Sequence, residues 1–87
     1  MIVEKDIDES KVYTLDWSNE LGNDTIEETD FDVGSELKLM NQWHSNTETN
    51  VLLEGGAAGN IYPVAAQVST VAGRVLEKVL FVQVIKK

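Results

Sequence analysis

The sequence of 87 residues predicts an all-β domain of about seven short strands, either a sandwich or a small barrel. Apolar and polar residues alternate over several segments, which is the period of a strand with one buried face. The segments recur roughly every 10–12 residues between turn-rich runs, and none has a convincing helical period. Residues 51–85 hold more than half of the apolar residues, so we expect the rest of the chain to fold against them.

Composition excludes several classes of protein. The formal net charge of −8 argues against nucleic-acid binding, because phosphates would be repelled over most of the surface. There is no cysteine, hence no disulfide and no thiolate metal site. No apolar run approaches the roughly 20 residues of a membrane helix. Residues 1–10 lack the basic and apolar regions of a signal peptide, so we expect synthesis in the cytoplasm.

The first third of the chain divides into an arm and two strands. Residues 1–10 have no clear period and are interpreted as an extended arm, laid on a partner or frayed, ahead of a domain at 11–87. Residues 12–17 alternate as a strand, and 18–24 form a loop. Residues 25–33 form a second strand in which Ile26 is out of phase, so we expect either a bulge near Glu27 or a place for Ile26 in the preceding loop.

The remaining strands lie on either side of a glycine-rich corner. We expect strands at 37–43, 49–53, 62–70 and 74–85, with a solvated loop at 44–50. Gly55–Asn60 (GGAAGN) has three glycines and permits a tight corner. Residues 71–73 form a hairpin loop that contains Gly73, and Arg74 follows as a turn-flanking residue with a possible interface role.

The last strand is apolar on both faces. Val79, Phe81 and Ile85 alternate with Leu80, Val82 and Val84. A strand of this kind is either central to its domain or covered by another chain. Val79, Phe81 and Ile85 are therefore candidate interface residues.

No group of residues predicts catalysis, a metal or a cofactor. His44 is the only histidine and is interpreted as an exposed loop residue. A Ser-His-Asp catalytic triad could be assembled from Ser45, His44 and Asp30, but no nucleophile elbow or comparable context supports it. Glu28, Asp30 and Asp32 share one strand face, which is solvated or docks a basic partner. The aspartates near the N-terminus lack a calcium-loop geometry, and the glycine-rich corner lacks the lysine of a phosphate loop.

The corner and the strand that follows resemble immunoglobulin-like domains. There, a glycine-bearing turn precedes a tyrosine whose hydroxyl bonds back to the backbone, and Tyr62 matches that residue. Val64 stands where antibody domains have a cysteine, so the inter-sheet disulfide is absent. Either Trp17 or Trp43 is expected to be the buried indole, and the order of strands favours Trp43.

Residues from about 5 to 85 also resemble small virion proteins of tailed bacteriophages, of the fibre–tail adaptor or minor structural type. The resemblance is carried by Asp16-Trp17, Leu21-Gly22, Asp24-Thr25-Ile26, Gly56, Gly59, Tyr62, Val64, Thr70 and Gly73-Arg74. It implies a non-enzymatic structural role, partners among other virion proteins (tail, fibre or capsid), a multi-copy assembly, and no nucleic acid or membrane.

Two alternatives stay open at this point. A capsid decoration or cement protein would have the same fold and would differ only in where it docks. A module that binds host-surface carbohydrate would need exposed aromatic side chains on loops, and Trp43 beside His44 is the only candidate.

Overall fold

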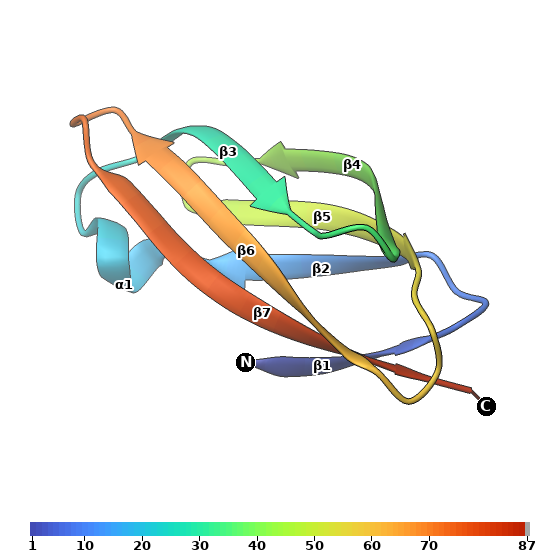
Figure 1. The fold of residues 1–87 in the computed structure, drawn as a ribbon. Helices are drawn as coiled ribbons and strands as arrows, with labels where there is room; N and C mark the ends of the chain where they lie inside the picture. The colour runs from blue at the N-terminus through green and yellow to red at the C-terminus, as the bar shows by residue number, and fades with distance from the viewer. Residues whose placement is uncertain (87) are drawn as a thin grey trace.

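The computed structural model describes residues 1–86 as seven strands and one short helix (Figure 1). The elements are β1 (Ile2–Asp6), β2 (Lys11–Asp16), α1 (Ser18–Leu21), β3 (Ile26–Asp32), β4 (Leu37–His44), β5 (Glu48–Gly55), β6 (Ile61–Thr70) and β7 (Val75–Ile85). The six strands expected between residues 12 and 85 are all present, with bounds that differ by a few residues. The long β6–β7 hairpin crosses in front of β2 and β5 in Figure 1.

The strands form two sheets that pack face to face. One sheet has the order β1-β7-β6-β3 and the other the order β2-β5-β4. Neighbouring strands are antiparallel except β1 and β7, which are parallel. The division of β2, β5 and β4 from β3, β6 and β7 is that of immunoglobulin domains, whose B, E and D strands face C, F and G. The predicted all-β, immunoglobulin-like sandwich is confirmed.

The residues expected to form an arm belong instead to a sheet. β1 runs beside the C-terminal half of β7, with Ile2 aligned to Phe81 and Asp6 aligned to Ile85. Lys5 points inward and is fully buried, and its Nζ donates to the carbonyl oxygens of Asp6 at 2.8 Å and Gly55 at 2.9 Å. These contacts satisfy an ammonium group that burial would otherwise penalise. Residues 2–6 therefore close one edge of the domain.

Two irregularities shape the edges of the sheets. The register of β3 against β6 shifts between Ile26 and Glu28, which confirms the bulge expected near Glu27. The bulge turns Ile26 inward, where it is buried. A second shift, between Leu39 and Asn41 of β4, has no counterpart among the expectations.

The segment expected to be a plain loop contains one helical turn. α1 covers four residues, Ser18–Leu21, and ends at Gly22, whose φ is 62°. Its single apolar anchor, Leu21, is buried. Four residues are too few to show a helical period, so alternation and spacing could not predict it.

The core lies between the sheets. It consists of the inward residues of the strands together with Trp17 and Leu21, and its largest fully buried members are Trp17, Lys5, Leu53 and Leu80. β6 and β7 contribute most regularly, because every second residue from Val64 to Val68 and from Leu80 to Val84 is fully buried. No helix within residues 1–86 is long and apolar enough to cross a membrane.

Candidate interaction surfaces

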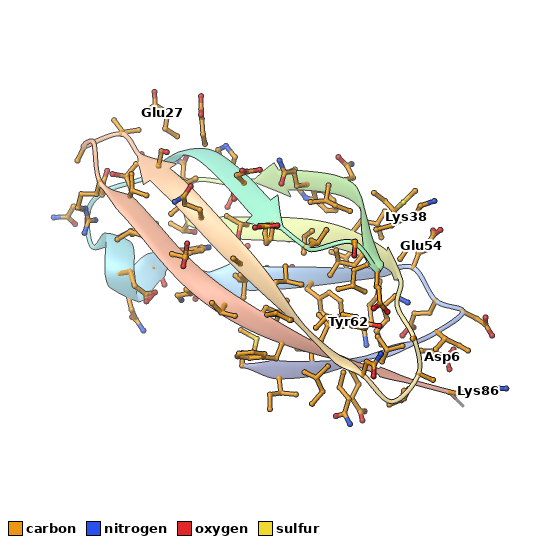
Figure 2. The ribbon with its side chains drawn as sticks, in the orientation of Figure 1. Asp6, Glu27, Lys38, Glu54, Tyr62 and Lys86 are labelled. Carbon is orange, nitrogen blue, oxygen red and sulfur yellow. The ribbon has the colours of Figure 1, made fainter. Side chains whose placement is uncertain are left out.

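Tyr62 fixes the corner between β5 and β6, in the position that the immunoglobulin-like resemblance implied. Its Oη accepts a hydrogen bond from the backbone N–H of Ala57 at 2.8 Å and donates to Glu36 Oε2 at 2.6 Å. Figure 2 shows the ring pointing into the end of the sandwich, toward the start of β4. The hydroxyl thus joins the corner to the turn that precedes β4, and the role of Tyr62 is structural.

The two tryptophans have opposite environments, and the expectation that Trp43 is the buried indole is wrong. Trp17 is fully buried, its Nε1 donates to Thr49 Oγ1 at 2.9 Å, and the Nζ of Lys78 lies 5.0 Å from its ring centroid. Trp43 is 42% exposed on β4. Trp17 follows β2 directly and so enters the core from the end of a strand, a position that strand order did not indicate.

The β6–β7 hairpin is fastened to the loop after α1. Gly73 has a φ of 89°, which a residue with a side chain rarely adopts. Arg74 Nε donates to Asp24 Oδ2 at 3.2 Å, and its Nη2 donates to the carbonyl oxygen of Leu21 at 2.9 Å. These partners lie within the same chain, so Arg74 holds the hairpin against the end of α1 and the loop that follows it.

The Asp24 carboxylate is the electrostatic centre of that fastening. A hydrogen bond from the Thr70 hydroxyl, then the N–H groups of Ala72 and Thr25 and the Arg74 guanidinium, lower the pKa of Asp24 to about 2, against the opposing effect of desolvation. Hydrogen bonds to a carboxylate favour its charged form. The hairpin is consequently tied to the segment after α1 by the Asp24 carboxylate, which stays charged well into the acid range.

The outer surface of the β1-β7-β6-β3 sheet, here called the four-strand face, carries exposed apolar side chains at its centre. Phe81 and Val79 are each 41% exposed, and Ile85 is half-buried. Strand pairing places Ile2 and Pro63 on either side of Phe81. The candidate interface residues Val79, Phe81 and Ile85 thus share one surface, while Leu80, Val82 and Val84 fill the core.

Acidic side chains border this apolar centre. Glu28, Asp30 and Asp32 are exposed on β3 at one edge, and Glu4 is exposed on β1 at the other. Beside Val79, an open hollow of about 260 Å³ is lined by Asp32, Gly34, Pro63, Ala65 and Val79. The four-strand face is therefore an apolar strip between two acidic edges.

The outer surface of the β2-β5-β4 sheet, here called the three-strand face, has a smaller apolar group. Trp43 and Val12 are 42% and 46% exposed, and Leu52 is half-buried. Pairing brings Val12 next to Leu52 and Trp43 next to Asn50, which is itself aligned with Thr14. Figure 2 shows Lys38 and Glu54 together at one end of this sheet, so its charges are mixed.

His44 and Ser45 make local contacts at the end of β4. His44 is exposed and its Nδ1 lies 2.8 Å from the carbonyl oxygen of Ser45. Ser45 Oγ accepts from the backbone N–H groups of Thr47 and Glu48 and so holds a turn. Within residues 1–86, no three acidic or histidine side chains are grouped so that they could hold a metal ion.

The sequence interpretation missed Ile2, Ile61 and Pro63 as surface residues. Ile2 is 67% and Ile61 53% exposed, and both lie on strands that border β7. The signal was present in the alternation of residues 61–69, whose outward phase includes Ile61 and Pro63. For Ile2 there was no such signal, because its place depends on pairing with residue 81.

The fold and its surfaces define a small immunoglobulin-like binding domain. The family model described as "Podophage GP4 fiber-tail adaptor protein gp77" matches residues 5–83. The chain belongs to this family of tailed-phage fibre–tail adaptor proteins, as the sequence resemblance implied, and it is a structural component of the virion whose partners are other virion proteins. No curated protein matches the chain at a significant level.

Proposed function

We propose that this chain joins the phage tail to its fibres by burying its two outer faces on different virion proteins. The observation that carries the proposal is the pair of exposed apolar groups on opposite surfaces of one sandwich, around Phe81 and around Trp43. Exposed contiguous apolar groups on a small domain mark interaction sites. Family membership supplies the nature of the partners.

The dimensions of the domain suit this role. The molecule measures 42 by 20 by 17 Å, so each broad face has room for the roughly 800 Å² per partner of a standard interface. A sandwich with a packed core transmits force between its faces without changing shape, since packed interiors deform little. Several copies around the tail would give each fibre its own attachment point.

The location of the protein on the particle is the first test. Particles that carry a tagged version of this chain would be labelled with a gold-conjugated antibody and imaged. We expect label where the fibres meet the tail. Label spread over the head would instead indicate a decoration protein and would overturn the proposal.

Surface variants test the use of both faces. Phe81→Ser and Trp43→Ser each remove an aromatic side chain of similar exposure from opposite faces. We expect one variant to fail to join the tail and the other to join the tail but carry no fibre, as judged by the protein composition of purified particles. Loss of the same partner in both variants would contradict the proposal.

A further inference from the structure

We propose that the four-strand face recognises a partner surface whose apolar side chains are flanked by lysine or arginine. This inference rests on the proposed function and adds to it, because it assigns one face of the adaptor to a partner of stated chemistry.

The apolar strip crosses three strands without interruption. Ile2, Phe81 and Pro63 are aligned on β1, β7 and β6, and the next outward pair is Val79 with Ala65. Each of these side chains is at least partly accessible, with Ile2 67% and Phe81 41% exposed. Covering such a strip removes apolar surface from water, which is the main source of binding free energy.

The charge around the strip has one sign. The outward strand positions include Glu4 on β1, Glu77 on β7 and Glu28, Asp30 and Asp32 on β3, and among the described residues none of these positions is lysine or arginine. A second copy docked face to face would oppose carboxylate to carboxylate, which is repulsive. A partner with basic groups beside its apolar ones is attracted, so complementarity selects a different, basic surface.

The hollow has the shape and chemistry of a site for one basic side chain. Pro63, Ala65 and Val79 give it apolar walls, and Asp32 supplies a carboxylate. Its volume of about 260 Å³ leaves room for the stem of a lysine or arginine. These side chains lay their methylene groups on apolar surface and keep the charge at a polar end. The hollow therefore adds a specific contact to the general attraction.

The three-strand face does not share this pattern. Lys38 and Glu54 are aligned across β4 and β5, so both signs of charge are present there. Trp43 and Phe81 have nearly equal exposure, 42% and 41%, which makes the two faces a matched pair for experiment.

Peptide titration followed by ¹⁵N NMR tests the inference on the intact chain. The probes are three synthetic peptides of equal length, which alternate leucine with lysine, leucine with glutamate, and serine with lysine. We expect the leucine–lysine peptide to bind most tightly and to shift the amide signals of Asp32, Val79 and Phe81. Added salt should weaken this binding, because it screens the acidic edges.

Paired variants give the contrast between the faces. Phe81→Ser should weaken binding about tenfold, the usual effect of truncating a central aromatic contact. Asp32→Asn should weaken it by a few-fold, as expected for one exposed ion pair. Trp43→Ser and Glu48→Gln are the controls on the other sheet and should leave the affinity unchanged. Ile2→Ser provides a second apolar variant if Phe81→Ser does not fold, which the dispersion of its spectrum will show.

Three results would overturn the inference: equal binding of the leucine–glutamate peptide, shifts confined to the three-strand face, or a dimer formed through the four-strand face at low ionic strength. Any of these, in a protein that antibody labelling has placed between tail and fibre, rejects the assigned face and leaves the adaptor role intact. Label over the head with peptide binding as expected would reject the adaptor role alone.

Discussion

Gly56 is the glycine with the least space for a side chain. Its φ is +91°, and a Cβ built on it would lie 2.7 Å from Val84 Cγ2 and 3.2 Å from Tyr62 Cε2. Gly59, in the same corner, has a φ of +90° and nothing within 4 Å of the corresponding Cβ position. Both glycines therefore have a positive φ, but only Gly56 has neighbouring atoms in the space that a side chain would need.

Gly56→Ala should destabilise the protein more than Gly59→Ala. Both variants incur the cost of a positive φ, about 1–3 kcal/mol, and only Gly56→Ala adds overpacking of about 1–3 kcal/mol. Urea denaturation would measure both free energies of unfolding. Equal losses would show that Val84 and Tyr62 move aside without cost.

Asp24 should make stability depend on pH in the acid range. Its pKa in the folded protein, about 2, lies below its ordinary value of 3.8. Its contribution is therefore fully present above about pH 4 and is lost as pH falls toward 2. Thermal unfolding from pH 5 to pH 2 should show a steeper loss in the wild type than in Asp24→Asn. Asp8→Asn removes a charge from an exposed loop and controls for net charge; parallel curves for all three proteins would contradict the prediction.

At the scale of elements, the β5–β6 corner depends on a single hydroxyl group. Tyr62 Oη contacts the Ala57 N–H, the Glu36 carboxylate and Asn60 Nδ2. Tyr13 Oη donates a hydrogen bond to the carbonyl oxygen of Glu4 at 2.8 Å.

Tyr62→Phe should cost about 1–2 kcal/mol of unfolding free energy, and Tyr13→Phe about 1 kcal/mol, because a hydrogen bond contributes about 0.5–1.5 kcal/mol. Chemical denaturation of both variants measures the difference. Increased mobility near the corner should accompany only the Tyr62→Phe change, as hydrogen exchange of residues 56–60 would show. A Tyr62→Phe variant as stable as the wild type would mean that the corner is held by its glycines alone.

Alternation predicted six of the seven strands, because each has a buried face and lies next to a turn signal. β1 was missed because its one fully buried residue is Lys5, and lysine is exposed to solvent in most proteins. Parallel pairing with β7 joins segments almost a whole chain apart, which no local pattern reports. The bulge near Glu27 was predicted because Ile26 broke the phase of an otherwise regular strand.

The candidate surface was only half predictable. The apolar outward phase of β7 was visible in the sequence and identified Val79, Phe81 and Ile85. The sequence did not show which tryptophan is buried, because Trp43 and Trp17 both continue an alternating strand. The deciding factor is three-dimensional: Trp17 contacts Thr49 on the neighbouring strand of its own sheet and Lys78 on the opposite sheet, whereas Trp43 faces outward beside Asn50.

At the scale of the whole molecule, net charge and exposed apolar surface oppose each other. The charge of −8 disfavours contact between copies, while the apolar strip around Phe81 favours it. Charge repulsion weakens with salt, because the screening length falls from about 10 Å at 0.1 M to about 3 Å at 1 M.

The isolated chain should therefore be a monomer at low ionic strength and should associate weakly at high ionic strength. Replacing Glu28, Asp30 and Asp32 with their amides should produce the same association without added salt, because the acidic edge would be neutral. Sedimentation velocity measures both effects. A dimer of the wild-type chain at low salt would contradict the prediction.

The burial of Lys5 gives the molecule a built-in chemical reporter. An amine-reactive reagent reaches exposed lysines such as Lys11 and Lys38 in the native protein, but Lys5 holds its ammonium between two carbonyl oxygens. Modification of Lys5, read by peptide mass mapping, can proceed only when β1 has separated from β7. The rate of that reaction would time the opening of this edge of the sandwich, and slower modification in assembled particles would show that a neighbour holds β1 closed.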